Sequence, residues 1–291
     1  MTATEPDNLV LAPRDVQWDW TGLPMHYIDG DPFTTHFANV LNILLPEGED
    51  WFITVFQQAV PMIKDDRLRE DVIGFIGQEA THSSSHQTVL THFEKVGFDT
   101  HPYTAQLRWF FSTMLGDRDL TGKKAQGWII DRVAIIAAIE HVTAYLGDWI
   151  LNADAIDRTD HNPEILDLYR WHGAEEVEHR AVAYDLFTHL DGRYRNRVRA
   201  HVVAFPVLLY WWVRGLRYLM AADPARIPGR DKPRFRDWFR ASRKGVLPSP
   251  ASLVRLYFGY LRPGYHPSHY GSTAQAVAYL AASPAARAAH R

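Results

Sequence analysis

Residues 171–179 read Trp-His-Gly-Ala-Glu-Glu-Val-Glu-His (WHGAEEVEH), and residues 78–82 read Gln-Glu-Ala-Thr-His (QEATH). Each stretch contains the motif Glu-x-x-His, which ends at His179 in the first stretch and at His82 in the second. Side chains three residues apart lie on one face of a helix, so each pair directs an oxygen and a nitrogen at the same point. The two copies predict two helices that face a shared metal site.

Single glutamates on two other helical segments complete this pattern. Glu140 follows the apolar run 133–139 (VAIIAAI), where an unpaired charge would be costly to bury. Glu49 has a rival in Glu47, and we prefer Glu49. Four carboxylates balance the charge of two divalent ions and would repel one another without metal. The predicted ligands of this two-metal site are Glu49, Glu79, His82, Glu140, Glu176 and His179.

A third histidine extends the predicted ligand set. His172 lies four residues before Glu176 and therefore shares its helical face, so we predict it as a seventh ligand. His86 stands four residues after His82 and is the alternative, either as a ligand or as a partner that orients one. We assign no catalytic residue beyond these ligands.

Other acidic residues near the motifs have competing interpretations. Glu175 and Glu178 lie on a neighbouring helical face, and only Glu176 begins a Glu-x-x-His motif. Asp148 and Asp185 either orient a histidine of the site or lie on helix surfaces.

Helical spacing of apolar residues dominates the chain, and no strand-like alternation is sustained. Pro46 and the three residues after it interrupt the pattern, and the second helix begins after this interruption or at Pro46 itself. We expect a loop at 223–249 and a loosely ordered tail after Ser272. The predicted helices cover residues 34–44, 50–62, 67–96, 103–115, 125–153, 163–190, 201–222 and 250–261.

These segments predict an all-α protein, a ferritin-like four-helix bundle with a crossover helix and additional C-terminal helices. We divide the chain into three parts. An irregular N-terminal arm occupies 1–32, the two-metal bundle occupies 33–200, and a C-terminal helical extension that packs on the bundle occupies 201–291.

The composition excludes several function classes. The 291 residues include no cysteine, which excludes disulfides, thiolate catalysis and iron–sulfur clusters. A net charge of −3 offers no basic footprint for nucleic acid. The polar N-terminus lacks an apolar signal segment, so we expect a cytoplasmic protein. Segment 201–222 is apolar but contains Arg214 and Arg217, which favours a bundle-packing helix, a homodimer contact or peripheral membrane contact over a spanning helix.

The ligand order resembles the ferritin-like di-iron carboxylate proteins, and in detail it is similar to the 4-aminobenzoate (arylamine) N-oxygenases. Members of that group add a histidine four residues before the last Glu-x-x-His, where His172 stands. This resemblance covers only the ligand positions. It implies a pair of iron ions, and it alone implies an aromatic amine as substrate.

A second likeness spans most of the chain, about residues 30–270. The chain looks like a bacterial family named predicted metal-dependent hydrolases. The segments that carry this likeness are 46–49 (PEGE), 78–82 (QEATH), 139–141 (IEH) and 260–267 (YLRPGYHP).

Three functions are compatible with such a site. Our main hypothesis is a di-iron oxidoreductase that activates O₂ to oxidise a small organic, lipid-like or aromatic amine substrate. Manganese or a mixed manganese–iron pair is an alternative to two irons. The chain has no dinucleotide fingerprint, so an external donor would supply electrons. The alternatives are a two-metal hydrolase of an ester or phosphoester, and a metal-binding protein without catalysis.

Overall fold

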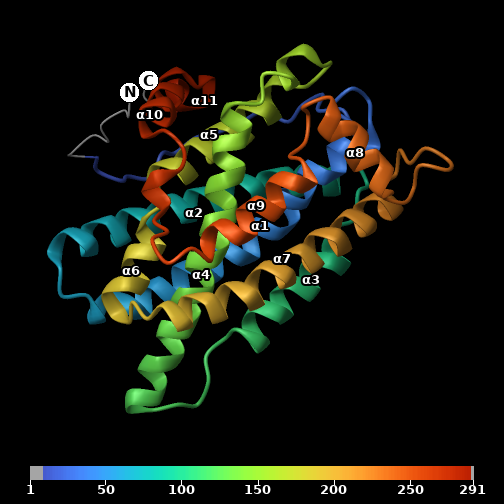
Figure 1. The fold of residues 1–291 in the computed structure, drawn as a ribbon. Coiled ribbons are helices and arrows are strands. Elements are labelled where there is room, and N and C mark those ends of the chain that lie inside the picture. The colour runs from blue at the N-terminus through green and yellow to red at the C-terminus, as the bar shows by residue number, and fades with distance from the viewer. Residues whose placement is uncertain (1–8, 290–291) are drawn as a thin grey trace.

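The computed structural model describes residues 9–289, and these form an all-helical bundle (Figure 1). Extended pairing within this range is limited to one isolated bridge between Ile28 and His161. The helices are α1 (Pro32–Ala59), α2 (Asp66–Lys95), α3 (His101–Trp109), α4 (Gly122–Leu151), α5 (Pro163–His179), α6 (Val182–Leu190), α7 (Tyr194–Ala222), α8 (Phe235–Arg243), α9 (Pro250–Tyr260), α10 (Thr273–Ala282) and α11 (Pro284–Ala289).

The bundle is built from two packed helix pairs, α1 with α2 and α4 with α5, and α7 lies against α1 and α4. The α3 crossover joins the two pairs and ends in a π-helical turn, Phe110–Met114. An added Cβ at Gly147 of α4 would lie 2.4 Å from the carbonyl oxygen of Gly173 and 3.1 Å from the Cβ of Glu176. Glycine at these positions therefore lets α4 and α5 approach closely beside a predicted ligand.

The predicted interruption near Pro46 is wrong, because the structure joins segments 34–44 and 50–59 into the continuous helix α1, and residues 60–62 follow as a 3-10 turn. Asp31 caps its start by accepting a hydrogen bond from the Thr34 backbone amide at 2.9 Å. Pro46 removes one backbone hydrogen bond from the helix interior. Burial of the residues around it outweighs this local cost and places Glu49 within a continuous helix.

The single helix predicted at 163–190 is also wrong, since it divides into α5 and α6 after His179. The side chain of Arg180 is buried and donates hydrogen bonds to the carbonyl oxygen of Val177 and, at 2.8 Å, to the Thr273 hydroxyl. Arg180 thus satisfies a carbonyl of the last turn that a continuing helix would have bonded. The apolar periodicity continues through the break and does not reveal it.

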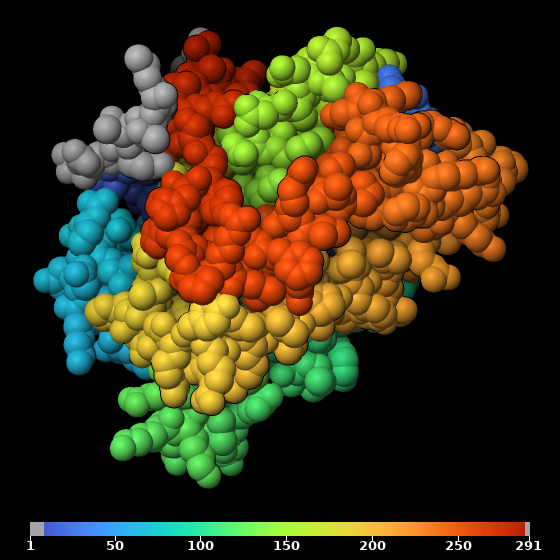
Figure 2. All heavy atoms as spheres, in the orientation of Figure 1, coloured from blue at the N-terminus to red at the C-terminus, as the bar shows by residue number. Residues whose placement is uncertain are grey.

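The C-terminal region is more ordered than we predicted. Helix α8 lies inside the segment predicted as a loop, and α10 and α11 lie in the segment predicted as a loose tail. Asp167 of α5 anchors this tail by accepting hydrogen bonds from the Tyr279 hydroxyl at 2.7 Å and from the Ser283 hydroxyl at 3.2 Å. Figure 2 shows the chain from α8 to α10, in orange and red, spread over one face of the molecule.

Other predictions are confirmed. The all-α bundle, α2, α4 and α9 lie where the sequence places them, within a few residues at each end. The apolar segment 201–222 belongs to α7, which starts earlier, at Tyr194. No helix among the described residues is long and apolar enough to cross a membrane. The N-terminal arm is irregular from residue 9 to residue 31, and its first eight residues lie outside the described range. The three-part domain division stays a prediction.

Candidate metal centre

The structure brings all seven predicted ligands together in the interior of the bundle, and each is at least nine-tenths buried. Helix α1 contributes Glu49 and α4 contributes Glu140, while α2 and α5 contribute the remaining residues. Several overlapping trios of these side chains offer ligand atoms that lie within 4.8 Å of one another. The members of the cluster are Glu49, Glu79, His82, Glu140, His172, Glu176 and His179.

One half of the cluster surrounds His179. Its Nε2 atom lies 3.4 Å from Glu79 Oε1 and 3.4 Å from Glu140 Oε2. The same nitrogen lies 3.5 Å from Glu176 Oε2. Three carboxylates from three helices therefore converge on one imidazole nitrogen.

The other half surrounds His82 and His172. His172 Nε2 lies 2.9 Å from Glu176 Oε1 and 4.0 Å from Glu49 Oε1. His82 Nδ1 lies 3.8 Å from Glu79 Oε2 and 3.8 Å from Glu176 Oε1. Glu79 and Glu176 thus offer one oxygen to each half, which is the arrangement that two bridging carboxylates require.

A charged network orients His82 from outside the cluster. The Nε2 atom of His82 lies 2.9 Å from Glu175 Oε2, so this nitrogen donates its proton and Nδ1 is left facing the cluster. Arg14 ion-pairs with Glu175 at 2.5 Å and with Glu178 at 2.9 Å. Arg14 comes from the N-terminal arm, so the arm closes this side of the site.

An amide performs the same task for His179. The Nδ1 atom of His179 lies 3.1 Å from Gln78 Oε1, which leaves Nε2 facing the carboxylates. Gln78 in turn donates from Nε2 to Glu178 Oε2 at 2.8 Å. Sequence reasoning treated Glu175 and Glu178 only as rivals of Glu176 and missed Gln78 and Arg14 as partners.

His86 orients His172. Its Nδ1 atom lies 2.8 Å from Asn42 Oδ1, and its Nε2 atom lies 3.0 Å from His172 Nδ1. The amide oxygen fixes the proton of His86 on Nδ1, so His86 Nε2 accepts from His172 Nδ1. The Nε2 atom of His172 is then directed at Glu49 and Glu176. These bonds place His86 behind His172, which is the orienting alternative considered for it.

The remaining acidic candidates lie elsewhere. Glu47 is ion-paired with Arg108 at 2.7 Å on the outside of α1. Asp185 pairs with His266 at 3.0 Å, and Asp148 accepts from Asn152, so neither hydrogen-bonds to a histidine of the cluster.

The unpaired atoms of the cluster fit a metal-binding role. Buried polar atoms nearly always have a hydrogen-bond partner. Here several buried oxygens and nitrogens that face one another have none among the described residues, although each is a suitable ligand for a divalent cation. These atoms are both carboxylate oxygens of Glu49, both of Glu79, Oε2 of Glu140, Oε2 of Glu176, Nδ1 of His82 and Nε2 of His179.

The electrostatics of the cluster lead to the same conclusion. Burial, followed by the charge of Glu79, raises the pKa of Glu49 well above its ordinary value. Burial and the charge of Glu176 raise the pKa of Glu140 to about 8. Burial also acts to raise the pKa of Glu176, but His179 and His172 hold it well below its ordinary value. Four buried carboxylates therefore need added positive charge, which protons or metal cations supply.

An apolar cavity of about 280 Å³ opens onto the cluster. The carboxylates of α1, α2, α4 and α5 are in its wall, and the rest of the wall is almost entirely aliphatic and aromatic side chains from α1, α4, α7 and the π-helical turn. Among the residues that the structure describes, none of those in this wall is an arginine or a lysine. The site therefore faces a pocket that accepts uncharged, apolar groups.

Comparison with known proteins identifies a family. The family described as "Predicted metal-dependent hydrolase" matches residues 12–271, which is most of the chain. No curated protein and no solved structure is a significant match to the chain.

This match corrects our main hypothesis about function. The prediction of a di-iron oxidoreductase that activates O₂ is wrong, because the family is one of metal-dependent hydrolases and agrees with the alternative hypothesis. The likeness to the predicted hydrolases is confirmed, while the likeness to the N-oxygenases is not. The ligand types that suit a di-iron oxygenase also suit other two-metal centres, so the ligand set alone did not separate the two chemistries.

Proposed function

The chain belongs to the family of predicted metal-dependent hydrolases, and on that premise we propose that it hydrolyses a carboxylic ester at a two-metal centre. The observation that carries this proposal is the buried cluster of four glutamates and three histidines with unpaired atoms, on the wall of an apolar cavity. We propose that the cluster members would hold the metal, since Glu79 and Glu176 each direct one oxygen toward either half of the cluster.

The charge balance favours an ester over a phosphoester. Four carboxylates offset the charge of two divalent cations, so the loaded site has little positive charge left to attract a phosphate. Within residues 9–289, the cavity wall adds no arginine or lysine that would clamp a phosphate. An uncharged carbonyl group enters such a pocket at a lower desolvation cost.

Bound metal ions would act as Lewis acids on the carbonyl oxygen and would lower the pKa of water. The protein residues position these ions and control access. Glu175, Gln78 and His86 fix the ring tautomers of the three ligand histidines. The apolar wall excludes bulk water from the site.

The overall reaction is balanced without any further reactant. Water adds to the acyl carbon, and the bond from that carbon to the alkoxy oxygen breaks. One proton of the water remains on the carboxylic acid, before its ionisation, and the other ends on the released alcohol. No oxidant, reductant or nucleotide is needed.

Hydrolysis by reloaded protein tests the proposal. Protein stripped with a chelator is reloaded separately with Zn²⁺, Mn²⁺ or Fe²⁺ and assayed on 4-nitrophenyl butyrate and on 4-nitrophenyl phosphate. We expect hydrolysis of the ester with at least one metal and at least a hundredfold loss in Glu140→Gln, which removes one of the four carboxylates.

The matched control is Glu47→Gln, because half-buried Glu47 pairs with the exposed Arg108 outside the cluster. This variant should keep full activity. Phosphate ester hydrolysis without ester hydrolysis, or equal activity in Glu140→Gln and the wild type, would contradict the proposal.

A further inference from the structure

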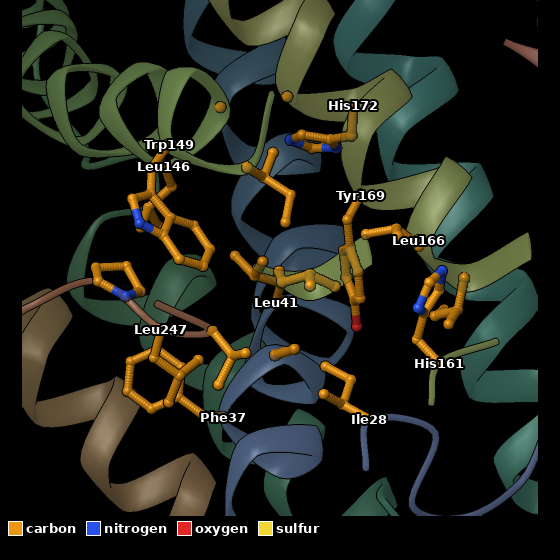
Figure 3. Close-up of a pocket in the computed structure, with 18 of the residues that line it drawn as sticks. Ile28, Phe37, Leu41, Leu146, Trp149, His161, Leu166, Tyr169, His172 and Leu247 are labelled. Atoms are coloured by element: carbon orange, nitrogen blue, oxygen red, sulfur yellow. The ribbon is translucent and has the colours of Figure 1, made fainter. Parts of the chain in front are cut away.

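Three cavities meet around two side chains beside the metal centre. Leu146 of α4 and Trp212 of α7 are in the walls of all three. The inner cavity is the one that opens onto the glutamates, and a second of about 90 Å³ reaches His172 and Tyr169. Figure 3 shows the His172 ring at one end of this second cavity and Phe37 and Ile28 at the other.

The third, outer cavity is larger, about 560 Å³, and lies between α7 and α8. Together the inner and outer cavities fall in the size range of ordinary small-molecule sites, roughly 300–1,000 Å³. The outer wall is apolar along α7, where Leu208 and Trp212 also face the inner cavity. Four residues are in the walls of both cavities and separate the external groove from the carboxylate cluster: Val142, Leu146, Leu208 and Trp212.

The rim of the outer cavity differs from its interior because it is basic. Arg217, Lys232 and Arg234 are in its lining together with one acidic residue, Asp231. Residues 231–235 contribute to this rim, and the surrounding segment 226–244 contains eight arginines and lysines against two aspartates. The whole chain, by contrast, carries a net charge of −3, so this segment is a local concentration of positive charge.

An exposed aromatic residue stands on the same rim. Phe235 at the start of α8 is in the cavity lining and is 68% exposed. An apolar ring beside cationic side chains matches a ligand that is charged at one end and apolar beyond it. The basic rim thus suits an anionic head group, and the apolar cavity behind it suits a hydrocarbon chain.

From this juxtaposition we propose that the site takes an anionic amphiphile, held at Lys232 and Arg234 by its charged group, with its apolar chain extending past Trp212 and Leu146 to the carboxylate cluster. The ester of such a molecule would lie within the apolar chain, where it reaches the metal centre. This inference rests on the proposed hydrolase function for the reaction, but binding of the amphiphile does not depend on hydrolysis.

Binding to metal-free protein tests the inference separately from activity. Laurate, 1-dodecanol and dodecyltrimethylammonium share a twelve-carbon chain and differ in the charge of the head. We titrate each, below its aggregation concentration, into the full chain and measure heat and tryptophan fluorescence. We expect laurate to bind about tenfold more tightly than dodecanol, with the cationic probe weakest.

Two variants locate the ligand. Lys232→Glu with Arg234→Glu should weaken laurate binding about tenfold or more and leave dodecanol unchanged. Arg236→Glu is the matched control, because Arg236 lies on α8, outside the cavity lining and exposed, and it should bind laurate like the wild type. Leu146→Trp should fill the junction and reduce binding of both laurate and dodecanol.

A thermal melt shows whether Leu146→Trp is folded. If it is not, the inference is tested with the rim variant, Lys232→Glu with Arg234→Glu. Equal affinity for the anionic and cationic probes would overturn the inference. Equal loss of laurate binding in Arg236→Glu and the rim variant would overturn it too. Laurate binding without ester hydrolysis would support the inference and contradict only the proposed function.

The anionic amphiphile has two sources, dispersed molecules in solution or a lipid in a bilayer. Sedimentation with vesicles of phosphatidylcholine and phosphatidylglycerol, abolished by Phe235→Ser, would indicate a bilayer source. Laurate binding without sedimentation would indicate a dispersed ligand. Either outcome supports the inference.

Discussion

The two Glu-x-x-His motifs are alike in sequence but are supported differently in the structure. His82 faces the cluster through Nδ1, and its outer nitrogen bonds to a carboxylate, Glu175, that Arg14 neutralises. His179 faces the cluster through Nε2, and its outer nitrogen bonds to a neutral amide, Gln78. A charged acceptor makes a stronger hydrogen bond and raises the basicity of the ring more than an amide does. The motif therefore places each histidine at the cluster, while partners distant in sequence determine which nitrogen faces it and how the other nitrogen is bonded.

The largest effect should come from a residue that both motifs share. Glu176 faces His179 through one oxygen and His172 through the other, and replacement by glutamine removes its charge from both halves. We expect Glu176→Gln to lose more than about a hundredfold in metal affinity, beyond the range for outer partners. Competition with a coloured chelator measures the affinity. If only one of two ions were lost, Glu176 would belong to one half alone.

Replacing Glu175, the charged hydrogen-bond partner of His82, should have the next largest effect on metal affinity. In Glu175→Gln the acceptor of the His82 Nε2 proton becomes a neutral amide, and Arg14 loses a partner. We expect a loss in metal affinity of nearly a hundredfold, at the upper end for an outer partner. Glu164→Gln, at the exposed start of the same helix, should change nothing. An effect as large in that control would mean that charge in general, not the bond to His82, matters.

Replacing Gln78, the neutral hydrogen-bond partner of His179, should reduce metal affinity less. Gln78→Leu removes the acceptor of the His179 Nδ1 proton without removing a charge. We expect about a tenfold loss in metal affinity, at the lower end of the range. Gln87→Leu on the exposed face of α2 is the control. A loss larger than that of Glu175→Gln would reverse the comparison between the two motifs.

The smallest effect should come from His201, a histidine outside the cluster. His201 donates from Nε2 to the carbonyl oxygen of Tyr257, while its buried Nδ1 has no partner among the described residues. Burial lowers its pKa from 6.5 to about 4, although the Tyr257 carbonyl opposes the shift. As the pH falls below 6.5, His201 is protonated in the unfolded chain but stays neutral in the folded protein. The free energy of unfolding therefore decreases.

Replacement of His201 should therefore flatten the pH dependence of stability. With chelator present throughout, we expect the wild type to lose about 1–2 kcal/mol more than His201→Gln between pH 7 and pH 4.5, after allowance for solvent screening. Urea unfolding at a series of pH values measures this difference. His269→Gln, at an exposed position, serves as control. Parallel curves for His201→Gln and the wild type would show that His201 is not the group responsible.

Local patterns predicted most of the helices and the members of the cluster. Spacing within one helix places Glu176 beside His179, because that geometry depends only on helical repeat. The apolar run before Glu140 indicated this residue, since a buried charge needs a partner. These inferences use information that lies within a few residues of each site.

The parts that could not be predicted depend on contacts between distant segments. Gln78 and Glu178 are bonded across 100 positions of the chain, and Arg14 reaches Glu175 across 161. Asp167 bonds to Tyr279 in the ordered tail, and the buried Arg180 after α5 bonds to Thr273, so both features involve partners far away in sequence. The predicted interruption at Pro46 is an error of the opposite kind, because burial of the surrounding residues outweighed a local helix-breaking signal.

Anomalous diffraction from crystals of metal-loaded protein would locate the ions themselves. We expect two peaks within the cluster, each bounded by one of the two Glu-x-x-His pairs, with Glu79 and Glu176 reaching both. A single peak would contradict the two-metal centre. Peaks that lie away from these glutamates and histidines would contradict the site as a whole.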